Sequence, residues 1–456
     1  MMFRVMTIAL VGGALATLLN DSPAHSIDEL SLEDYDIENL TRFFFEGTGD
    51  YHDPLNSQYR LRDPDELLNC SQIIQRYGYP AENHLVQTKD GYILEIQRIP
   101  YGRYTSRLAN GSRPVIYLQH GLLSSSFDFV ANPPDESLGY ILADQGFDVW
   151  LGNVRGNTYG RKHVNMTPSD MRFWDFSFDE FIAIDVPAVI DYILNKTGEQ
   201  SLYYVGHSQG TTIMFGLLSI KPEYQDKIKA YVALAPVANV TTITSPVRWL
   251  APFANDLSWI LEWLGDGELL GNSKLIKFLA STLCTFSVSK GLCEDVIFLV
   301  CGIDTVELNV TRIPVYISHT PAGSSVKNII HFAQEIRARR FQMYDYGASE
   351  NQKRYNQTRP PQYDITKITK TPIAIYSSKN DWFADPADVN ILRKKLPSLV
   401  HDYRVSEAKF THIDFLYGVR ANTLVYKDVL SFLASCKTVI NSRHPVNSNS
   451  SCLPST

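Results

Sequence analysis

Strand-length apolar runs alternate with helix-length amphipathic patterns along much of this chain. Residues 115–119, 146–151 and 202–205 are short apolar runs rich in strand formers. Residues 178–194 space acidic side chains among apolar ones, as an amphipathic helix does when it packs on a sheet. Because repeated alternation of strands and helices is typical of parallel sheets, the pattern predicts an α/β fold with a mostly parallel central sheet.

Two further patterns mark where this alternation begins and where it is interrupted. The Asp90-Gly91 step between two strand patterns predicts a hairpin near the start of the fold. After the apolar strand 230–235 the alternation stops, and it resumes only near Pro372. We therefore expect a mainly helical insertion at 239–366. Its tryptophan-rich and apolar segments favour a cap or lid over the serine described below, although most of these side chains must form the insertion's own core.

A second part of the core follows the insertion. Strand patterns at 371–378 and 400–405 come first, and a helical pattern then runs from Asp414 to Ala434. The chain is thus predicted to begin with a signal peptide (1–24) and an acidic N-terminal extension (25–66). A first core part (67–238), a cap or lid insertion (239–366), a second core part (367–435) and a C-terminal tail (436–456) then follow.

The first residues have the pattern of a secretory signal peptide. Arg4 precedes an apolar run from Val5 to Leu19, which is shorter than the ~20 residues of a membrane span, and small residues follow it. The acidic stretch 25–66 is only weakly patterned, so a solvated extension is the simplest interpretation, with a propeptide or a flexible arm as alternatives. We therefore expect a luminal or extracellular mature protein without a transmembrane segment.

The composition is that of an ordinary globular protein. Hydrophobic residues make up 44% of the chain and charged residues 20%. The net charge of −7 gives no indication of a basic surface that would bind nucleic acid. Acceptor patterns for N-glycosylation recur along the chain and favour a secretory glycoprotein. Asn69 is the least secure acceptor because Cys70 follows it. The other candidates are Asn39, Asn110, Asn165, Asn195, Asn239, Asn309, Asn356 and Asn449.

The candidate chemistry centres on the stretch 206–210, which reads Gly-His-Ser-Gln-Gly. It lies between the strand pattern 202–205 and the long apolar pattern 211–218. A strand, a tight turn and a helix in this order turn the motif into a nucleophile elbow, in which small residues let Ser208 occupy a strained turn with its hydroxyl exposed. The alternative, a glycine-rich turn with an incidental serine, is disfavoured by the flanking strand and helix.

A nucleophile elbow requires an acid and then a histidine further along the chain. Asp381 lies in a short polar loop after the strand pattern 371–378, and His412 lies in the loop after 400–405. Two neighbours compete with them. Asp385 precedes Pro386 and is better interpreted as a helix N-cap, and His401 lies inside a strand. We therefore predict that Ser208 is the nucleophile, His412 the general base, and Asp381 the anion that orients the imidazole.

The elbow also requires donors for the oxyanion of the reaction intermediate. The strand pattern 115–119 runs directly into His120-Gly121-Leu122, where Gly121 lets the backbone approach a substrate closely. We expect the two donors to be the backbone N–H groups of Leu122 and Gln209. No cofactor and no metal ion is needed for this chemistry, and we predict neither.

Several long stretches resemble the acid lipase family of α/β-hydrolases in family order, from about Leu67 to Leu433. The resemblance implies hydrolysis of neutral lipid esters, triacylglycerol or cholesteryl ester, with Ser208, Asp381 and His412 as the catalytic triad. It also implies Leu122 and Gln209 as oxyanion donors and a cap with a mobile lid. The matching stretches are residues 79–80, 90–94, 119–123, 148–157, 206–210, 321–325 and 381–386.

The cysteines suit a disulfide-forming compartment. Three of the six lie in the insertion without a Cys-x-x-Cys pattern, and the secretory route favours a disulfide over a zinc site. By resemblance to the family, Cys284 and Cys293 are expected to pair and Cys301 to stay free. The spacing of Cys70, Cys436 and Cys452 leaves their pairing open.

The sequence therefore predicts a secreted or lysosomal hydrolase that meets its lipid ester at an oil–water or membrane interface. The alternatives are a carboxylesterase or thioesterase for smaller soluble acyl substrates, and a lipid-binding protein without catalysis. Family resemblance alone also implies activity in acid, which requires the pKa of His412 in the free enzyme to lie below the usual ~6.5. The sequence gives no indication of the oligomeric state.

Overall fold

The computed structural model describes residues 63–104, 113–245, 268–269, 306–441 and 452, which belong to a compact unit from Asp63 to Thr456. Several predictions lie outside the described residues. They are the signal peptide, residues 25–62 of the extension, the tryptophan-rich and apolar segments of the predicted lid at 246–267 and 270–305, the Cys284–Cys293 pair with Cys301, and the acceptors Asn39, Asn110 and Asn449. No helix in the described ranges is both long enough and apolar enough to cross a membrane.

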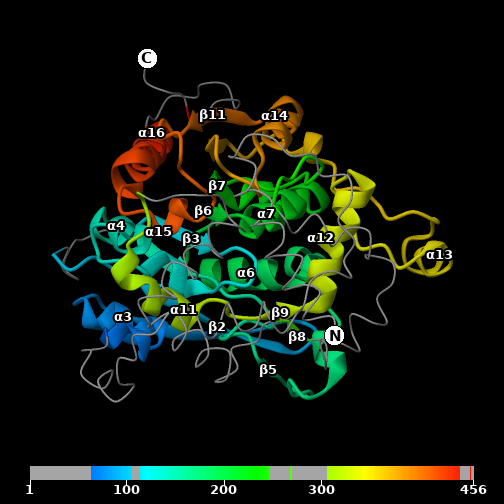
Figure 1. Ribbon diagram of the computed structural model, residues 1–456, viewed down its shortest axis with the longest axis horizontal. Coiled ribbons are helices and arrows are strands. Elements are labelled where there is room, and N and C mark those ends of the chain that lie inside the picture. The colour runs from blue at the N-terminus through cyan, green and yellow to red at the C-terminus, as the bar shows by residue number, and fades with distance from the viewer. Residues whose placement is uncertain (1–62, 105–112, 246–267, 270–305, 442–451, 453–456) are drawn as a thin grey trace, which may run out of the picture. The chain divides into compact units, whose positions relative to one another are not determined.

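A nine-stranded sheet forms the centre of the described chain, in the order β1-β2-β4-β3-β6-β7-β10-β11, with β5 paired to β2 (Figure 1). All pairings from β4 to β11 are parallel, whereas β2 pairs antiparallel with β1, β4 and β5. The prediction of a mostly parallel sheet is therefore confirmed. The strands are β1 (Glu82–Gln87), β2 (Tyr92–Ile99), β3 (Val115–Gln119), β4 (Asp148–Leu151), β5 (Lys162–His163), β6 (Leu202–His207), β7 (Ile228–Leu234), β10 (Ile373–Ser377) and β11 (Leu399–Arg404).

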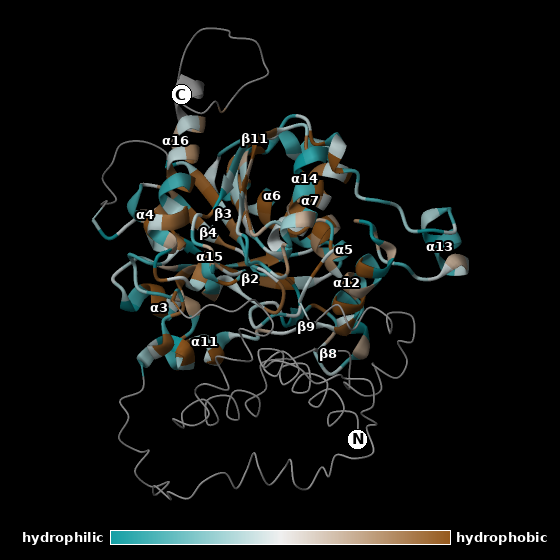
Figure 2. Cartoon of the chain, turned by 45° about the horizontal axis from the view of Figure 1, so that its top comes forward, coloured by the Kyte–Doolittle hydropathy of each residue, from teal (hydrophilic) through white to brown (hydrophobic). Residues whose placement is uncertain are grey.

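Helices lie on both faces of this sheet. The α-helices among the described residues are α3 (Cys70–Arg76), α4 (Leu138–Asp144), α5 (Phe178–Glu180), α6 (Val186–Thr197), α7 (Gln209–Ile220), α11 (Ile313–His319), α12 (Val326–Ala338), α13 (Ala348–Tyr355), α14 (Pro386–Lys395), α15 (Asp414–Tyr417) and α16 (Lys427–Asn441). Short 3₁₀ turns occur at Pro64–Glu66, Ser126–Val130, Met171–Trp174, Pro222–Asp226, Val310–Arg312 and Ile365–Lys367. The mostly exposed α13 is largely hydrophilic, as Figure 2 shows.

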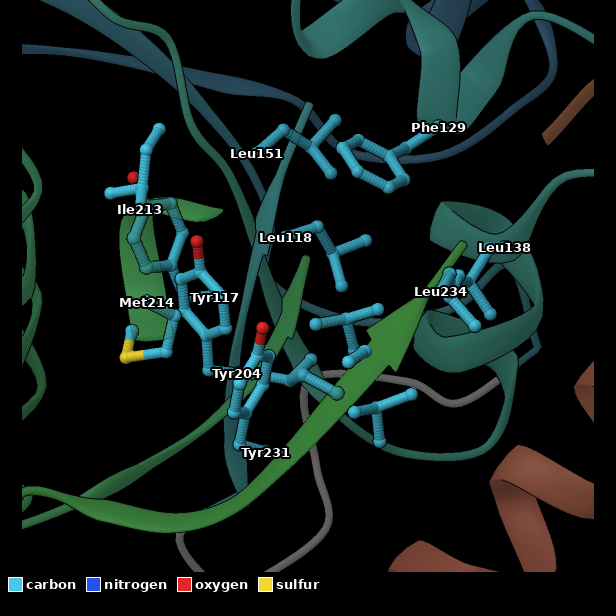
Figure 3. Packing of buried hydrophobic residues seen from close by; sticks show 14 of the residues in the cluster. Tyr117, Leu118, Phe129, Leu138, Leu151, Tyr204, Ile213, Met214, Tyr231 and Leu234 are labelled. Carbon is cyan, nitrogen blue, oxygen red and sulfur yellow. The ribbon is translucent and has the colours of Figure 1, made fainter. Parts of the chain in front are cut away.

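The core fills both faces of the central strands (Figure 3). Tyr117, Tyr204 and Tyr231 form a row of edge-to-face contacts, with ring centroids 5.3 and 5.5 Å apart, beneath α7. The hydroxyl groups of Tyr204 and Tyr231 donate to the carbonyl oxygens of Gly210 and Thr211, at 2.8 and 3.0 Å. Because a buried tyrosine hydroxyl needs a partner, these bonds fix the first turn of α7 to the sheet.

The predicted hairpin is confirmed. β1 and β2 are antiparallel with Gln87 opposite Ile93, and the Asp90-Gly91 step lies in the turn. Gly91 has φ +102, and a Cβ there would lie 2.7 Å from the His163 ring. Only glycine satisfies both conditions without strain.

The predicted helix at 178–194 is present as α5, a π-helical turn at Phe181–Asp185 and α6. The prediction of one helix from Asp414 to Ala434 is wrong. The chain leaves the helix after α15 and returns through a π-helical turn at Asn422–Tyr426 to α16. Glu307 explains the break, because its backbone carbonyl accepts from Val419 and its carboxylate accepts from the backbone of Arg420.

The chain between β7 and β10 adds no strand to the central sheet within its described residues. It contributes α11, α12, α13 and a two-stranded pair formed by β8 (Glu268–Leu269) and β9 (Ser324–Ser325). Ile313, Val315 and Tyr316 of α11 pack within the main hydrophobic core. Part of the predicted insertion is therefore continuous with the main hydrophobic core.

The folded unit begins slightly earlier than the boundary drawn at residue 67. Asp65 is fully buried, and its carboxylate pairs with Arg76 at 3.0 Å and with Arg312 at 2.9 Å. This acidic residue is therefore held by charge-assisted hydrogen bonds and is not part of a solvated extension. At the other end of the chain, Cys436 and Cys452 form a disulfide, and Cys70 is a free, buried thiol.

Candidate functional site

Ser208 lies between the end of β6 and the first residue of α7, with φ 53 and ψ −121. Positive φ is a strained conformation for a residue with a side chain, and it survives only where the surroundings impose it. The flanking glycines provide those surroundings. A Cβ on Gly206 would lie 2.7 Å from the Gly210 carbonyl, and a Cβ on Gly210 would lie 2.2 Å from the Gln119 carbonyl. Strand, turn and helix are thus packed closely around Ser208.

The structure brings Ser208, His412 and Asp381 into one hydrogen-bonded chain. Ser208 Oγ lies 2.7 Å from His412 Nε2, and His412 Nδ1 lies 2.9 Å from both Asp381 carboxylate oxygens. The carboxylate accepts from Nδ1–H, which leaves the Nε2 lone pair facing the serine hydroxyl. This is the arrangement in which an imidazole takes a proton from a serine as the serine attacks a carbonyl carbon.

Asp381 is held in place by its own loop. Its Oδ1 accepts from the backbone N–H groups of Phe383 and Ala384 at 2.9 and 2.8 Å, and its side chain is fully buried. The competing residues have other partners. Asp385 accepts from Ala387 N at 2.8 Å and caps α14, which confirms its interpretation as an N-cap, while His401 contacts Asp428 at 2.6 Å.

The turn after β3 lies against Ser208. A Cβ on Gly121 would lie 3.0 Å from Ser208 Cβ, so a larger residue there would crowd Ser208. Leu122 follows in the same turn, and Gln209 is the first residue of α7, whose N–H has no acceptor within its own helix. The two predicted donor residues therefore come from turns that meet at Ser208.

Two histidines missed as functional residues by the sequence reasoning surround this chain of groups. His207 Nε2 donates to the backbone carbonyl of His412 at 2.9 Å, and His120 Nδ1 donates to the Gly121 carbonyl at 2.7 Å while Nε2 faces the Asn157 amide. Burial lowers the pKa of His120 to about 4 and that of His207 to about 3. Both rings are thus neutral donors that hold backbone groups of the site. Their positions within the two glycine motifs are the signal that sequence reasoning had available.

Two surface cavities lie elsewhere in the described chain. They measure about 370 and 530 Å³ and are lined by residues such as Arg339, Arg340, Arg359, Tyr363 and Lys395. Neither is lined by Ser208, His412 or Asp381. Both cavities are therefore separate from the hydrogen-bonded chain of Ser208, His412 and Asp381.

The described glycosylation candidates differ in exposure. Asn165, Asn195 and Asn356 are exposed, whereas Asn239 and Asn309 are half-buried. Asn309 Oδ1 accepts from the backbone of Thr311, and the Asn69 side chain caps α3. Glycosylation at these positions stays a prediction.

Comparison with known proteins agrees with this geometry. Residues 114–419 match the family described as alpha/beta hydrolase fold, and residues 70–133 match the partial alpha/beta-hydrolase lipase region. The protein is therefore an α/β-hydrolase. An epoxide hydrolase structure from Vigna radiata aligns over 78% of this chain and 98% of its own, at 14% identity and a TM-score of 0.43.

Sequence relatives narrow the class further. The chain is 44% identical to lysosomal acid lipase/cholesteryl ester hydrolase from Homo sapiens, over 81% of this chain and 92% of that protein. It is 42% identical to gastric triacylglycerol lipase from Homo sapiens (82% and 93% covered) and 43% identical to lipase lipl-1 from Caenorhabditis elegans (81% and 92%). The chain belongs to the acid lipase family.

Proposed function

We propose that this protein hydrolyses ester bonds of neutral lipids, triacylglycerol or cholesteryl ester, through an acyl-enzyme on Ser208. The observation that carries the proposal is the hydrogen-bonded chain from Ser208 through His412 to Asp381. Membership of the acid lipase family supports the substrate class, because the human relatives are named for triacylglycerol and cholesteryl ester. A binding protein has no need of all three side chains in this order.

In the first half-reaction, Ser208 Oγ attacks the ester carbonyl carbon while His412 Nε2 takes the hydroxyl proton. The carbonyl oxygen becomes an oxyanion, which accepts hydrogen bonds from the backbone N–H groups of Leu122 and Gln209. His412 then gives its proton to the leaving alcohol, and the acyl group stays on Ser208. A water molecule, activated in the same way by His412, releases the fatty acid.

Asp381 acts on His412 and not on the substrate. Its carboxylate holds Nδ1–H, so Nε2 is the basic nitrogen, and its charge stabilises the imidazolium that forms after proton transfer. His207 and His120 keep the backbone of His412 and Gly121 in place. Since both rings have strongly lowered pKa values, they remain neutral in moderate acid and keep these donor roles.

We further propose that the protein acts in the secretory route, in the lysosomal lumen or outside the cell, and works in acid. The signal-peptide pattern and the names of the relatives support this placement. Substrate then reaches the site from an oil–water or membrane interface. A carboxylesterase or thioesterase for soluble substrates remains the alternative, and activity that rises sharply above the solubility limit of a short-chain ester favours the lipase.

The decisive experiment compares the purified protein with Ser208→Ala on emulsified triolein and cholesteryl oleate, at about pH 4.5 and 7.5. We expect hydrolysis by the wild type and a loss of at least about 10³-fold in the variant, because the nucleophile is gone. The preferred substrate and pH then identify the physiological ester. Equal, negligible rates for both proteins would contradict lipid ester hydrolysis.

A further inference from the structure

The side chain of Gln209 has a partner far from the nucleophile turn in sequence. Gln209 Nε2 donates to Asn328 Oδ1 at 3.1 Å, and both side chains are buried. Leaving a buried amide without its partner costs more free energy than the bond contributes when formed. The direction of the Gln209 side chain is therefore fixed by the first turn of α12.

Asn328 is itself held on both sides. Its Nδ2 donates to Ser324 Oγ at 3.1 Å, and its backbone N–H donates to Ser325 Oγ, the N-cap of α12, at 3.0 Å. These partners leave one orientation for the amide, with Oδ1 toward Gln209. Ser324 and Ser325 form β9, which pairs with Glu268 and Leu269 of β8. The side chain that reaches Gln209 is thus anchored to a strand pair of the insertion.

The same segment also contacts the other turn of the site. The backbone N–H of Ala322 donates to the carbonyl oxygen of Leu123 at 2.6 Å. Leu123 follows Leu122 and has φ 59, a conformation that needs external support in a leucine. Residues 322–328 therefore contact both turns that carry the oxyanion donors, one through Leu123 and one through Gln209.

We infer that Asn328 is a positioning residue that sets the place of the Gln209 backbone N–H relative to the Leu122 N–H. The inference rests on the proposed function, since it concerns the oxyanion of that reaction. Asn328 does not touch the reacting atoms. It acts by fixing the first residue of α7 from a segment that also supports the opposite donor. Displaced donors stabilise the oxyanion less, so kcat falls while substrate binding in the ground state is preserved.

Asn328→Leu tests this inference, because leucine has the same branching and number of side-chain heavy atoms as asparagine and removes both side-chain hydrogen bonds. On a soluble short-chain ester we expect kcat to fall about tenfold with KM within about twofold of wild type, less than the ~100-fold loss of a whole donor. Asn351→Leu is the matched control. Asn351 is equally buried and bonded on both sides, but only to residues 345–358, so its loss should lower the thermal midpoint and leave kcat unchanged.

A double-mutant cycle shows whether Asn328 acts through Gln209. Gln209→Met keeps the backbone N–H and removes the side-chain donor, so it should also lower kcat about tenfold. If the two residues act as one unit, the double variant loses about tenfold and not about 100-fold. A multiplied loss, or an Asn328→Leu protein with wild-type kcat, would overturn the inference.

Two controls separate this outcome from other failures. If Asn328→Leu does not fold, Asn328→Ser serves in its place, and the same fall in kcat at unchanged KM is expected. Ser208→Ala and the wild type are measured in the same assay. Absent hydrolysis of emulsified triolein and cholesteryl oleate by the wild type refutes the proposed function, whereas wild-type hydrolysis with an insensitive Asn328 variant refutes only the positioning role.

Discussion

Asp381 and Asp385 are residues of one type in one loop, and their contacts give them different tasks. Asp381 is buried against His412, while Asp385 accepts from Ala387 N and Thr242 Oγ1 at the start of α14. The difference comes from position. Asp381 follows β10 at the edge where the carboxyl ends of the parallel strands meet, and Asp385 is followed by a proline that starts a helix.

Replacing each aspartate with asparagine distinguishes the orientation of His412 by Asp381 from the capping of α14 by Asp385. In Asp381→Asn the amide N–H disfavours the Nδ1–H tautomer, so Nε2 carries the proton and cannot accept one from Ser208. We expect kcat to fall by about 10⁴. In Asp385→Asn the N-cap is retained, because asparagine caps as well as aspartate, and activity and stability should stay near wild type. Kinetics on one ester and a thermal melt check both variants, and a slow Asp385→Asn enzyme would reverse the assignment.

At the scale of elements, the site depends on how closely α7 approaches β3. The sheet register places Gln119 of β3 beside Gly206 of β6, and α7 then starts over the end of β3. Gly210 allows this approach, since no side chain fits between its Cα and the Gln119 carbonyl. The helix that begins at Gln209 and the turn that carries Leu122 are positioned by the same contact.

Gly210→Ala should therefore lower kcat by more than the accompanying loss of unfolding free energy can explain. Its Cβ would lie 2.2 Å from a backbone carbonyl, so α7 must move from β3, at a cost of about 1–3 kcal/mol in unfolding free energy and a large fall in kcat. Gly198→Ala is the control. Gly198 has φ +74 and open space around it, so alanine costs about 1–2 kcal/mol in strain without a change in kcat. Similar kinetics in both variants would show that this contact does not support the site.

Sequence reasoning found the features that are local in the chain. The Asp90-Gly91 turn, the N-cap Asp385 and the glycines around Ser208 each follow from a few adjacent residues, and so they were predictable. The burial of Asp65 and the hydrogen bond of Asn328 were not, because their partners Arg312 and Gln209 are 247 and 119 residues away in sequence. The helix break after α15 has the same cause, since it depends on contacts with Glu307.

At the scale of the whole molecule, buried carboxyl groups and buried histidines change the stability of the fold in opposite directions as the pH falls. Burial raises the pKa of several carboxyl groups, and each of these favours the folded state in acid: Asp128, Asp179, Glu180, Asp185 and Glu335. Burial lowers the pKa of His120, His207 and His331, and this contribution to stability is lost as the pH falls from ~6.5 toward those values. The buried carboxyl groups therefore offset the histidines in the acid range proposed for activity.

Asp128 provides a test of the contribution that a buried carboxyl group makes to folding stability. Its carboxyl group is buried beneath Ser124 and Tyr417, both of which donate to it, and burial raises its pKa to about 6. Since the folded pKa exceeds the unfolded value of ~3.9, its contribution is complete below that value and is lost as the pH rises through about 6. Asp128→Asn does not titrate.

The difference in unfolding free energy between Asp128→Asn and wild type should therefore shift in favour of the variant between about pH 4 and pH 7, by up to roughly 3 kcal/mol. Denaturant unfolding at both pH values measures this difference in unfolding free energy. Asp226→Asn is the control. Asp226 forms an exposed ion pair with Lys370, and since exposed pairs contribute little to stability, this variant should show little change with pH. A difference for Asp128→Asn that is flat with pH, or that moves the other way, would show that this carboxyl group is ionised throughout. Any offset against the buried histidines in acid would then have to come from the remaining buried carboxyl groups.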